Sequence, residues 1–371
     1  MTKPQSKHVL KLRKTLLAHY DARGRALSWR IRPKDRADGA VADPYKIWLS
    51  EIMCQQTTVT AVTPYWHKFL AKWPSVNDLA NAPRDEVLAA WAGLGYYARA
   101  RNLHKCAGVV ANELGGEFPN SEQQLLTLPG IGPYSAAAIA SICFGAPTNV
   151  VDGNVERVIS RLYMVENPLP KGRAELREHA GEIASPNRRR SHRNGDYGQA
   201  LMDLGSQICK PKNPKCEECP WSFACLATKA GVPENYPKKI KKQKPPNRYG
   251  AVFYLERERE GTREILLQQR PDKGLLGGMM QLPTTDWTDT QHPLDHLLTQ
   301  APYPHNWQLC DKPVKHVFTH FTLHLKVFTA QTRGDVEGVW ARLDELDNYA
   351  LPSLMRKAIK VGEIKGNFVM F

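Results

Sequence analysis

Four cysteines near the middle of the chain restrict its fold more than any other feature of the sequence. They stand at Cys209, Cys216, Cys219 and Cys225, with the spacing Cys-x6-Cys-x2-Cys-x5-Cys. Four thiolates on one short loop can enclose a cubane of iron and sulfide, which demands soft ligands. Zinc usually takes two close pairs with two to four residues between the cysteines, and the first and last gaps here are longer. The spacing therefore favours an iron–sulfur cluster over zinc or four unrelated thiols.

The other cysteines and the start of the chain bear on its location. Four further cysteines are scattered, which suits reduced thiols in a reducing compartment; they are Cys54, Cys106, Cys143 and Cys310. Residues 1–14 are polar and basic and lack the apolar core of a signal peptide. No stretch approaches the roughly 18 apolar residues of a membrane span. We expect a cytoplasmic, nucleoid-associated bacterial protein with no membrane partner.

The chain carries a large surplus of positive charge. Its 371 residues include 51 Lys and Arg against 37 Asp and Glu, a formal net charge of +14. Such a surplus favours a polyanion partner such as nucleic acid, the alternative being solubility alone. Lys210, Lys212 and Lys215 lie inside the cysteine loop, which would then be a rigid phosphate-binding surface. No flavin motif or further cysteine pair indicates electron transfer, so we expect a structural cluster.

Hydrophobic periodicity divides the chain into three parts. Residues 1–228 have apolar residues at helical spacing, residues 229–248 are rich in Pro and Lys as linkers are, and residues 249–371 mix strand and helix patterns. The clearest helical segments of the first part are 9–18, 47–59, 86–92, 98–114, 134–144, 155–163 and 199–208. In the last part, strands are predicted at 249–255, 264–269 and 315–329, and helices at 293–298 and 353–359. The expected fold is an all-α body joined by a basic linker to an α+β domain.

A glycine-rich turn lies between two helical segments of the first part. Residues 128–134 read Leu-Pro-Gly-Ile-Gly-Pro-Tyr, with Gly130 and Gly132 able to form a tight hairpin. Pro133 fits the first turn of the following Ala-rich helix. The N-terminus of that helix would offer free backbone N–H groups to a phosphate. The alternative is a plain connection between two helices.

Two carboxylates stand at positions where a solvated side chain is not expected. Glu51 shares the apolar stripe of its helix with Ile47 and Trp48, so it is either paired with an Arg or shifted toward its protonated form. A raised pKa is what a general acid requires near neutral pH. Asp152 ends an apolar run where a helix begins, and there Asp152 or Asn154 could simply be an N-cap. One protonated and one ionised carboxyl group together would suit cleavage of a glycosidic bond.

In combination, these motifs resemble the helix–hairpin–helix DNA glycosylase superfamily, and within it the adenine DNA glycosylases. The matching segments are residues 27–30, 43–48, 48–57, 93–97, 128–134, 151–157 and 197–205, beside the cysteine loop. The resemblance implies a single 4Fe-4S cluster on the four cysteines. It also implies a monofunctional enzyme of base excision repair that removes adenine mispaired with 8-oxoguanine or, more weakly, with guanine. Its partner would be double-stranded DNA holding such a mispair, bound by a monomer. No motif identifies a protein partner such as a sliding clamp.

The resemblance also implies roles for individual residues. Glu51 would protonate adenine N7, Asp152 would stabilise the oxocarbenium-like sugar, Asn154 would orient these groups, and Tyr134 would lie beside the sugar. For Tyr134 the alternative is a packed aromatic residue beside the hairpin. The base must leave the stack to react, and the residues implied to line its pocket are Trp29, Arg30 and Gln199.

Other residues would act on the duplex around the flipped base. Gln56, Leu94 and Tyr96 would enter the gap left in the stack, although core packing is the alternative for Leu94 and Tyr96. Related endonuclease III enzymes carry a Lys just after the hairpin that forms a Schiff base, and here Pro133 and Tyr134 stand there. Without that amine we expect weak or no strand cleavage.

The last part of the chain resembles the 8-oxoguanine-reading domain of the same family, which has a Nudix-like fold. The segments that carry this resemblance are 274–283 and 316–321. No Arg-Glu-x-x-Glu-Glu run follows Pro283, so the domain should bind without hydrolysing. Phe318, Thr319 and His320 would read the damaged base, the alternative being a hairpin that faces the core.

Several departures from the family pattern qualify these expectations. Met279-Met280-Gln281 replaces the usual aromatics, Thr319 stands for the usual Ser, and the loop between residues 32 and 43 is long. An Arg-rich stretch, Arg188-Arg189-Arg190 with Arg193, resembles an insertion that contacts phosphate or is merely solvated. The competing hypotheses are a thymine or oxidised-pyrimidine glycosylase and a catalytically silent lesion-binding protein.

Overall fold

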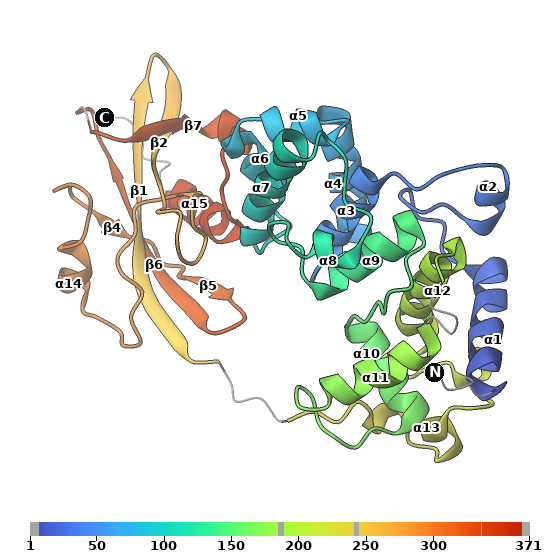
Figure 1. The fold of residues 1–371 in the computed structure, drawn as a ribbon. Coiled ribbons are helices and arrows are strands. Elements are labelled where there is room, and N and C mark those ends of the chain that lie inside the picture. Colours follow the sequence, from blue (N-terminus) through green and yellow to red (C-terminus); the bar gives the residue numbers. More distant parts are fainter. Residues whose placement is uncertain (1–6, 185–188, 241–244, 335, 366–371) are drawn as a thin grey trace. The chain divides into compact units, whose positions relative to one another are not determined.

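The computed structural model describes residues 7–184, 189–240, 245–334 and 336–365. The chain forms two compact units, residues 1–80 with 105–241, and residues 81–104 with 242–371 (Figure 1). Some predicted features lie outside the described residues, namely Arg188 of the Arg-rich stretch and the linker residues Lys241, Lys242 and Lys244. The boundaries predicted at residues 228 and 249 remain predictions.

The first unit is built from helices, as the sequence predicted. Its α-helices are α1 (Lys7–Arg23), α2 (Pro33–Ala37), α3 (Pro44–Cys54), α4 (Val59–Lys72), α5 (Val76–Asn81), α8 (Glu122–Leu125), α9 (Pro133–Phe144), α10 (Gly153–Tyr163), α11 (Arg173–Ala184), α12 (His192–Asp203) and α13 (Leu226–Lys229). A π-helix, η1 (Leu204–Ile208), and two 3₁₀ turns, η2 (Cys216–Glu218) and η3 (Pro233–Asn235), complete it. Helix α6 (Arg84–Trp91) lies in the second unit, and α7 (Ala98–Glu113) begins there and ends in the first.

The helices begin and end where local chemistry dictates. Asp43 caps α3, because its Oδ1 accepts a hydrogen bond from the Tyr45 N–H at 2.9 Å. Pro133 opens α9 as predicted, and Gly145, at φ 64°, ends it. The single helix predicted over 47–59 is wrong: α3 ends at Cys54, and Gln56, at φ 57°, reverses the backbone before α4 begins.

Helix α9 lies at the centre of the first unit. Its Ala-rich sequence is buried from Ser135 to Cys143, and α3, α8 and α12 pack against it. Small side chains allow close approach of neighbouring backbones, and Gly195 of α12 is an example, since a Cβ there would lie 2.7 Å from the Ile142 Cα. This close packing fixes α3, α9 and α12 relative to one another.

The second unit contains a mixed sheet. Its strands are β1 (Asn247–Arg259), β2 (Thr262–Gln269), β3 (Met280–Gln281), β4 (Gln308–Leu309), β5 (Val314–Val317), β6 (Thr322–Gln331) and β7 (Val339–Arg342). The order is β3-β2-β1-β6-β4, with β5 also paired to β6 and β7 to β2. Strands β1 and β6 are parallel, with Val252 opposite Val327, and the other pairs are antiparallel. The strand predicted over 315–329 is interrupted by a turn at 318–321, where the Phe318 N–H donates to the Phe321 carbonyl at 2.8 Å.

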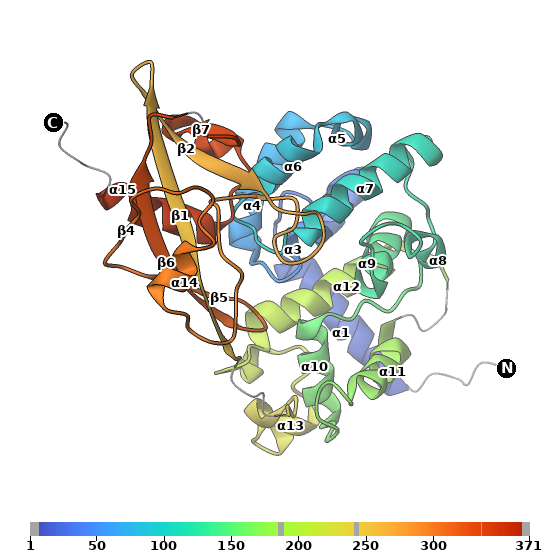
Figure 2. The same cartoon turned by 90° about the vertical axis from the view of Figure 1, so that its left-hand side faces the viewer.

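Helices cover both faces of this sheet. Val252 and Tyr254 of β1 belong to one buried cluster with residues of α15 (Ser353–Lys365). Phe253, which points the other way, packs with Leu297 of α14 (Leu294–Leu298) (Figure 2). A 3₁₀ segment, η4 (Leu343–Asn348), joins β7 to α15. The predicted α+β class is confirmed.

Among the described residues, no helix combines the length and the apolar character required to cross a bilayer.

Candidate active site

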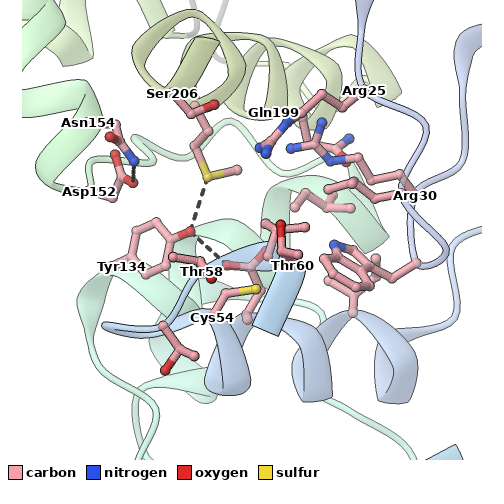
Figure 3. A pocket seen from close by; sticks show the side chains of 18 residues that line it. Arg25, Arg30, Cys54, Thr58, Thr60, Tyr134, Asp152, Asn154, Gln199 and Ser206 are labelled. Atoms are coloured by element: carbon pink, nitrogen blue, oxygen red, sulfur yellow. Dashed lines mark hydrogen bonds between the residues drawn. The ribbon is translucent and has the colours of Figure 1, made fainter. Parts of the chain in front are cut away.

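A cavity of about 420 Å³ opens in the first unit. It brings together seven residues that the sequence singled out, although they are spread over residues 29–199 of the chain (Figure 3); they are Trp29, Arg30, Glu51, Tyr134, Asp152, Asn154 and Gln199. Helices α3, α9, α10 and α12 each contribute to its wall. The sequence could not place the two carboxyl groups near each other, and the fold brings both to one cavity.

Glu51 and Tyr134 form a hydrogen-bonded pair in the wall of this cavity. Glu51 is 8% exposed, and the Tyr134 hydroxyl donates to its Oε2 at 2.7 Å. Burial raises the pKa of Glu51, whereas the hydrogen bond from Tyr134 and the charge of Arg30 oppose the shift. Burial beside Glu51 also raises the pKa of Tyr134, so Tyr134 keeps its proton. Glu51 is therefore a carboxyl group biased toward the protonated state.

Asp152 and Asn154 lie on the same cavity from the start of α10. The Val155 N–H donates to Asp152 Oδ1 at 2.7 Å, and the Asn154 amide donates to Asp152 Oδ2 at 2.8 Å. Asp152 is thus the N-cap that the simpler interpretation required, and its carboxylate also borders the cavity. Arg157 in turn holds Asn154, with its Nη2 3.0 Å from the Asn154 Oδ1.

Arg30 is held by Asp203, a residue to which the sequence pattern assigns no role. Asp203 accepts Arg30 Nη1 at 2.7 Å and Arg25 Nε at 2.6 Å, and the Arg30 and Asp203 side chains are 4% and 7% exposed. Burial opposes ionisation of Asp203, but the two arginines outweigh it and lower its pKa. Because Arg30 pairs with Asp203, the alternative role of Glu51 as the partner of a buried Arg receives no support.

Three further residues of the cavity wall are held in place by contacts with neighbouring side chains. Trp29 lies against Trp66, with ring centroids 5.6 Å apart, and Gln199 is 1% exposed. Met202 places its sulfur 3.1 Å from the Tyr134 hydroxyl. Met202 was missed as a wall residue, and only its place between Gln199 and Asp203 on one helix could have suggested it.

A second cavity, of about 680 Å³, adjoins the first and shares Glu51, Tyr134 and Asp152 with it. Gln56 and Gly132 line it, together with Arg177 of α11. The exposed Gln56 has the left-handed φ of 57°, a conformation that costs free energy in a non-glycine residue. Gly130, at φ 76°, turns the hairpin that leads into α9. Predicted duplex-contacting groups thus border the predicted catalytic ones.

The four cysteines of the loop converge in the same unit. Burial raises the pKa of the Cys219 thiol to about 12, and the other three thiols raise it further, so Cys209, Cys216 and Cys225 all lie near Cys219. Among the described residues no three His, Cys, Asp or Glu side chains converge as ligands of a single ion.

Donors around the sulfurs suit a thiolate-ligated cluster. Arg161, 2% exposed, places Nη1 3.3 Å from Cys209 Sγ and donates to two loop carbonyls. The Trp221 N–H lies 3.4 Å from Cys219 Sγ, and the Thr228 hydroxyl lies 3.5 Å from Cys216 Sγ. Positive charge and donors of this kind stabilise the negative charge of thiolate ligands.

Comparison with known proteins places both parts of the chain. The family model of the HhH-GPD superfamily of base excision DNA repair proteins matches residues 49–185, that of the iron–sulfur binding domain of endonuclease III matches residues 209–225, and that of the NUDIX domain matches residues 251–361. The human adenine DNA glycosylase is 32% identical over 95% of this chain and 74% of its own length. The adenine DNA glycosylase of Buchnera aphidicola subsp. Schizaphis graminum is 30% identical over 85% of this chain and 91% of its own length. The chain belongs to the adenine DNA glycosylase family.

As a member of the adenine DNA glycosylase family, the chain is a DNA glycosylase, a hydrolase acting on N-glycosyl bonds in base excision repair. The structure of a thermostable thymine-DNA glycosylase is 30% identical, with a TM-score of 0.51, and covers 60% of this chain and 98% of its own. The match to the endonuclease III domain supports an iron–sulfur cluster on the loop of 209–225.

The predicted lesion-reading residues lie in the second unit. Phe318 is half-buried, whereas Thr319 and His320 are exposed on the turn between β5 and β6. Tyr96, at φ 48° and 49% exposed, places its hydroxyl 3.1 Å from Thr319 Oγ1. Leu94 is 6% exposed, so core packing describes its present state, and entry into DNA would require it to leave the core.

The described part of the Arg-rich stretch makes contacts within the first unit. Arg190 donates to the carbonyls of Asn120 and Phe144 at 3.0 and 3.1 Å. Arg193 bridges Asp21 and Asp196 at 2.8 and 2.9 Å. Solvation alone therefore does not describe these two residues: Arg193 joins α12 to α1, and Arg190 joins the segment before α12 to the carbonyls of Asn120 and Phe144.

Proposed function

We propose that this enzyme removes adenine from duplex DNA in which it is mispaired with 8-oxoguanine or guanine. The observation that carries the proposal is the pair of carboxyl groups on one cavity, the buried Glu51 bonded to Tyr134 and Asp152 bonded to Asn154 and the α10 backbone. The two groups have the different environments that an acid and a charge stabiliser need. The choice of adenine as the released base rests on the likeness of this chain to adenine DNA glycosylases.

In the proposed mechanism, Glu51 supplies the proton. The flipped adenine enters the cavity between Trp29 and Gln199, and Glu51 protonates N7, which turns the base into a leaving group. Tyr134 donates its hydroxyl hydrogen to Oε2, which leaves Oε1 to carry the transferable proton. Arg30 is paired with Asp203. Glu51 therefore does not have to be ionised to balance the charge of Arg30.

Asp152 would act on the sugar. Departure of the base leaves positive charge on the deoxyribose, and a carboxylate oriented by two hydrogen bonds stabilises that charge without reorganising. The same carboxylate would accept a proton from the attacking water. Asn154 keeps Asp152 in place, and Tyr134 borders the sugar.

Recognition of the opposite base would fall to the exposed residues. Gln56 and Tyr96, both with strained left-handed backbones, would fill the gap in the stack. Thr319 would hydrogen-bond the lesion from the turn that also carries Phe318 and His320. The 8-oxoguanine preference follows from this assignment, and the Nudix-like domain would bind the base without hydrolysing it.

A thymine glycosylase is the second candidate. It is favoured by the likeness to the thermostable thymine-DNA glycosylase, which covers 60% of this chain. The acid at position 51 argues against it, because the endonuclease III enzymes that act on pyrimidines carry Gln there.

The test is a panel of duplexes that hold adenine, thymine or an oxidised pyrimidine opposite chosen bases. We expect adenine to be released, and the strand to break only after alkali treatment, because no amine stands after the hairpin to open the sugar. A strand break without alkali on a pyrimidine lesion would contradict both expectations.

We further propose that the loop holds one 4Fe-4S cluster on Cys209, Cys216, Cys219 and Cys225. The cluster would fix the loop so that Lys210, Lys212 and Lys215 meet backbone phosphates. When bound, the cluster would cross-link the loop. Arg161 supports the loop by donating hydrogen bonds to two of its carbonyl oxygens. Protein purified without chelators should contain about four iron atoms per chain and absorb broadly in the visible range. One zinc per chain instead would refute the assignment.

The raised pKa of Glu51 gives the reaction a directed pH dependence. Since Glu51 must be protonated to act, single-turnover adenine release should be fastest below its folded-state pKa and should fall as the pH rises through that value. The fall should approach tenfold per pH unit at its steepest. Rates measured from pH 5 to 9 at fixed ionic strength test this, and a rate that rises with pH would assign Glu51 the role of a base.

We propose that the enzyme binds as a monomer to duplex DNA. The first domain would be residues 1–228, the linker 229–248 and the reader 249–371.

A further inference from the structure

The segment of residues 81–104 contains Leu94 and Tyr96, which are predicted to enter the gap in the base stack, and it belongs to the second unit. Its helix α6 begins with Arg84, whose guanidinium forms a bidentate ion pair with Asp272. Nη1 donates to Oδ2 at 3.0 Å, and Nη2 donates to Oδ1. From α7, Arg101 donates through Nη1 to the carbonyl oxygen of Gly277. The loop of residues 270–278, between β2 and β3, is thereby fastened to α6 and α7.

Two adjacent glycines of this loop, Gly277 and Gly278, make the contacts possible. A Cβ at Gly277 would lie 2.3 Å from the Asp272 carbonyl oxygen, and one at Gly278 would lie 2.3 Å from Arg84 Nη2. Gly278 also has a φ of +73°. Gln269 holds the loop from the sheet, because its Nε2 donates to the Gly278 carbonyl at 3.2 Å. The loop is therefore shaped to bring the Asp272 carboxylate to Arg84 and the Gly277 carbonyl to Arg101.

Residues 94–96 are attached to α6 and α7. Arg99 Nη2 donates to the carbonyls of Leu94 and Gly95 at 3.1 and 3.2 Å, and its guanidinium lies over the Tyr96 ring. Trp91 Nε1 donates to Gly95 at 3.1 Å. Tyr96 then reaches Thr319. The segment is thus held at two places, by the loop of 270–278 and by the turn of 318–321.

We propose that Arg84, Asp272 and Arg101 are positioning residues that set Tyr96 against the lesion-reading turn, and so determine the preference for 8-oxoguanine over guanine opposite adenine. The inference rests on the proposed function. Chemistry at Glu51 is the same for both mispairs, so the preference must come from groups that meet the opposite base. Release of the segment would misplace Tyr96 relative to Thr319 without changing the cavity of the first unit.

The test measures the ratio of single-turnover adenine release opposite 8-oxoguanine to that opposite guanine. For Asp272→Ala and Arg84→Ala we expect this ratio to fall about two- to fivefold, the upper range for loss of an exposed bidentate ion pair. The rate opposite guanine should stay near that of the wild type. The double variant Arg84→Asp with Asp272→Arg restores the pair in reverse and should recover most of the ratio.

Arg342→Ala is the matched control, because it breaks an exposed Arg–Asp pair with Asp344 in the same unit and should leave the ratio unchanged. Asp272→Asn provides the test if Asp272→Ala does not fold, and thermal melting identifies that case. An unchanged ratio in the folded single variants, or a double variant as impaired as both singles combined, would overturn the inference. Failure of the wild type to release adenine opposite 8-oxoguanine would instead overturn the proposed function.

Discussion

Replacement of Glu51 by Gln should abolish adenine release, with a loss of about 10²–10⁴-fold in the single-turnover rate. Gln keeps the shape of the side chain and can still accept the Tyr134 hydroxyl, which lies 2.7 Å from Oε2 in the wild type. It cannot give a proton to N7. Affinity for the mispaired duplex should stay within about threefold of the wild type, because no contact to phosphate is removed.

A matched control separates loss of the acid from loss of any Glu whose pKa is raised by burial. Glu122 of α8 lies in the same unit and burial raises its pKa as well, but it does not line the cavity. Glu122→Gln should release adenine at the wild-type rate. Near-normal turnover by Glu51→Gln would refute the assignment of Glu51 as the acid.

Replacement of Asp203 by Asn should be among the most destabilising changes in the cavity wall. Asp203 and Arg30 are 7% and 4% exposed, and removal of one partner of a buried pair leaves the other charge uncompensated. We expect the free energy of unfolding to fall by about 3–5 kcal/mol. Because ionic partners hold the pKa of Asp203 below its unfolded value, its contribution is present above that unfolded value and is lost as the pH falls through the folded one.

Asp35→Asn serves as the comparison for Asp203→Asn. Asp35 pairs with Arg32 at 2.9 Å, but both side chains are well exposed, at 34% and 42%. Denaturant unfolding of the two variants at pH 7 should show a clear fall in midpoint for Asp203→Asn and almost none for Asp35→Asn. Equal effects would mean that burial of the Arg30 pair does not determine its strength.

The parts of the site that sequence predicted well are those coded locally. Glu51 is a candidate acid because it lies on an apolar stripe. The four cysteines are candidate cluster ligands because of their spacing. The helical body and the α+β domain followed from a change of hydrophobic period. In each case the signal lies within a few residues of the group concerned.

The parts that were missed depend on contacts between distant segments. Asp203 holds Arg30 from 173 positions away, and no local pattern distinguishes it from an ordinary helical Asp. Helix α4 contains Pro64, which weakens the helical signal. The turn at 318–321 interrupts what reads as continuous strand, because alternation continues across it. The attachment of residues 81–104 to the second unit likewise depends on Asp272 and Gly277, which only folding brings near.

The most direct test of the central claim compares base release by the wild-type enzyme from two duplexes of one sequence, with adenine opposite 8-oxoguanine and with thymine opposite guanine. Free base is measured by chromatography before any alkali is added. The account predicts free adenine from the first duplex and little or no thymine from the second. Thymine release at the greater rate would contradict it.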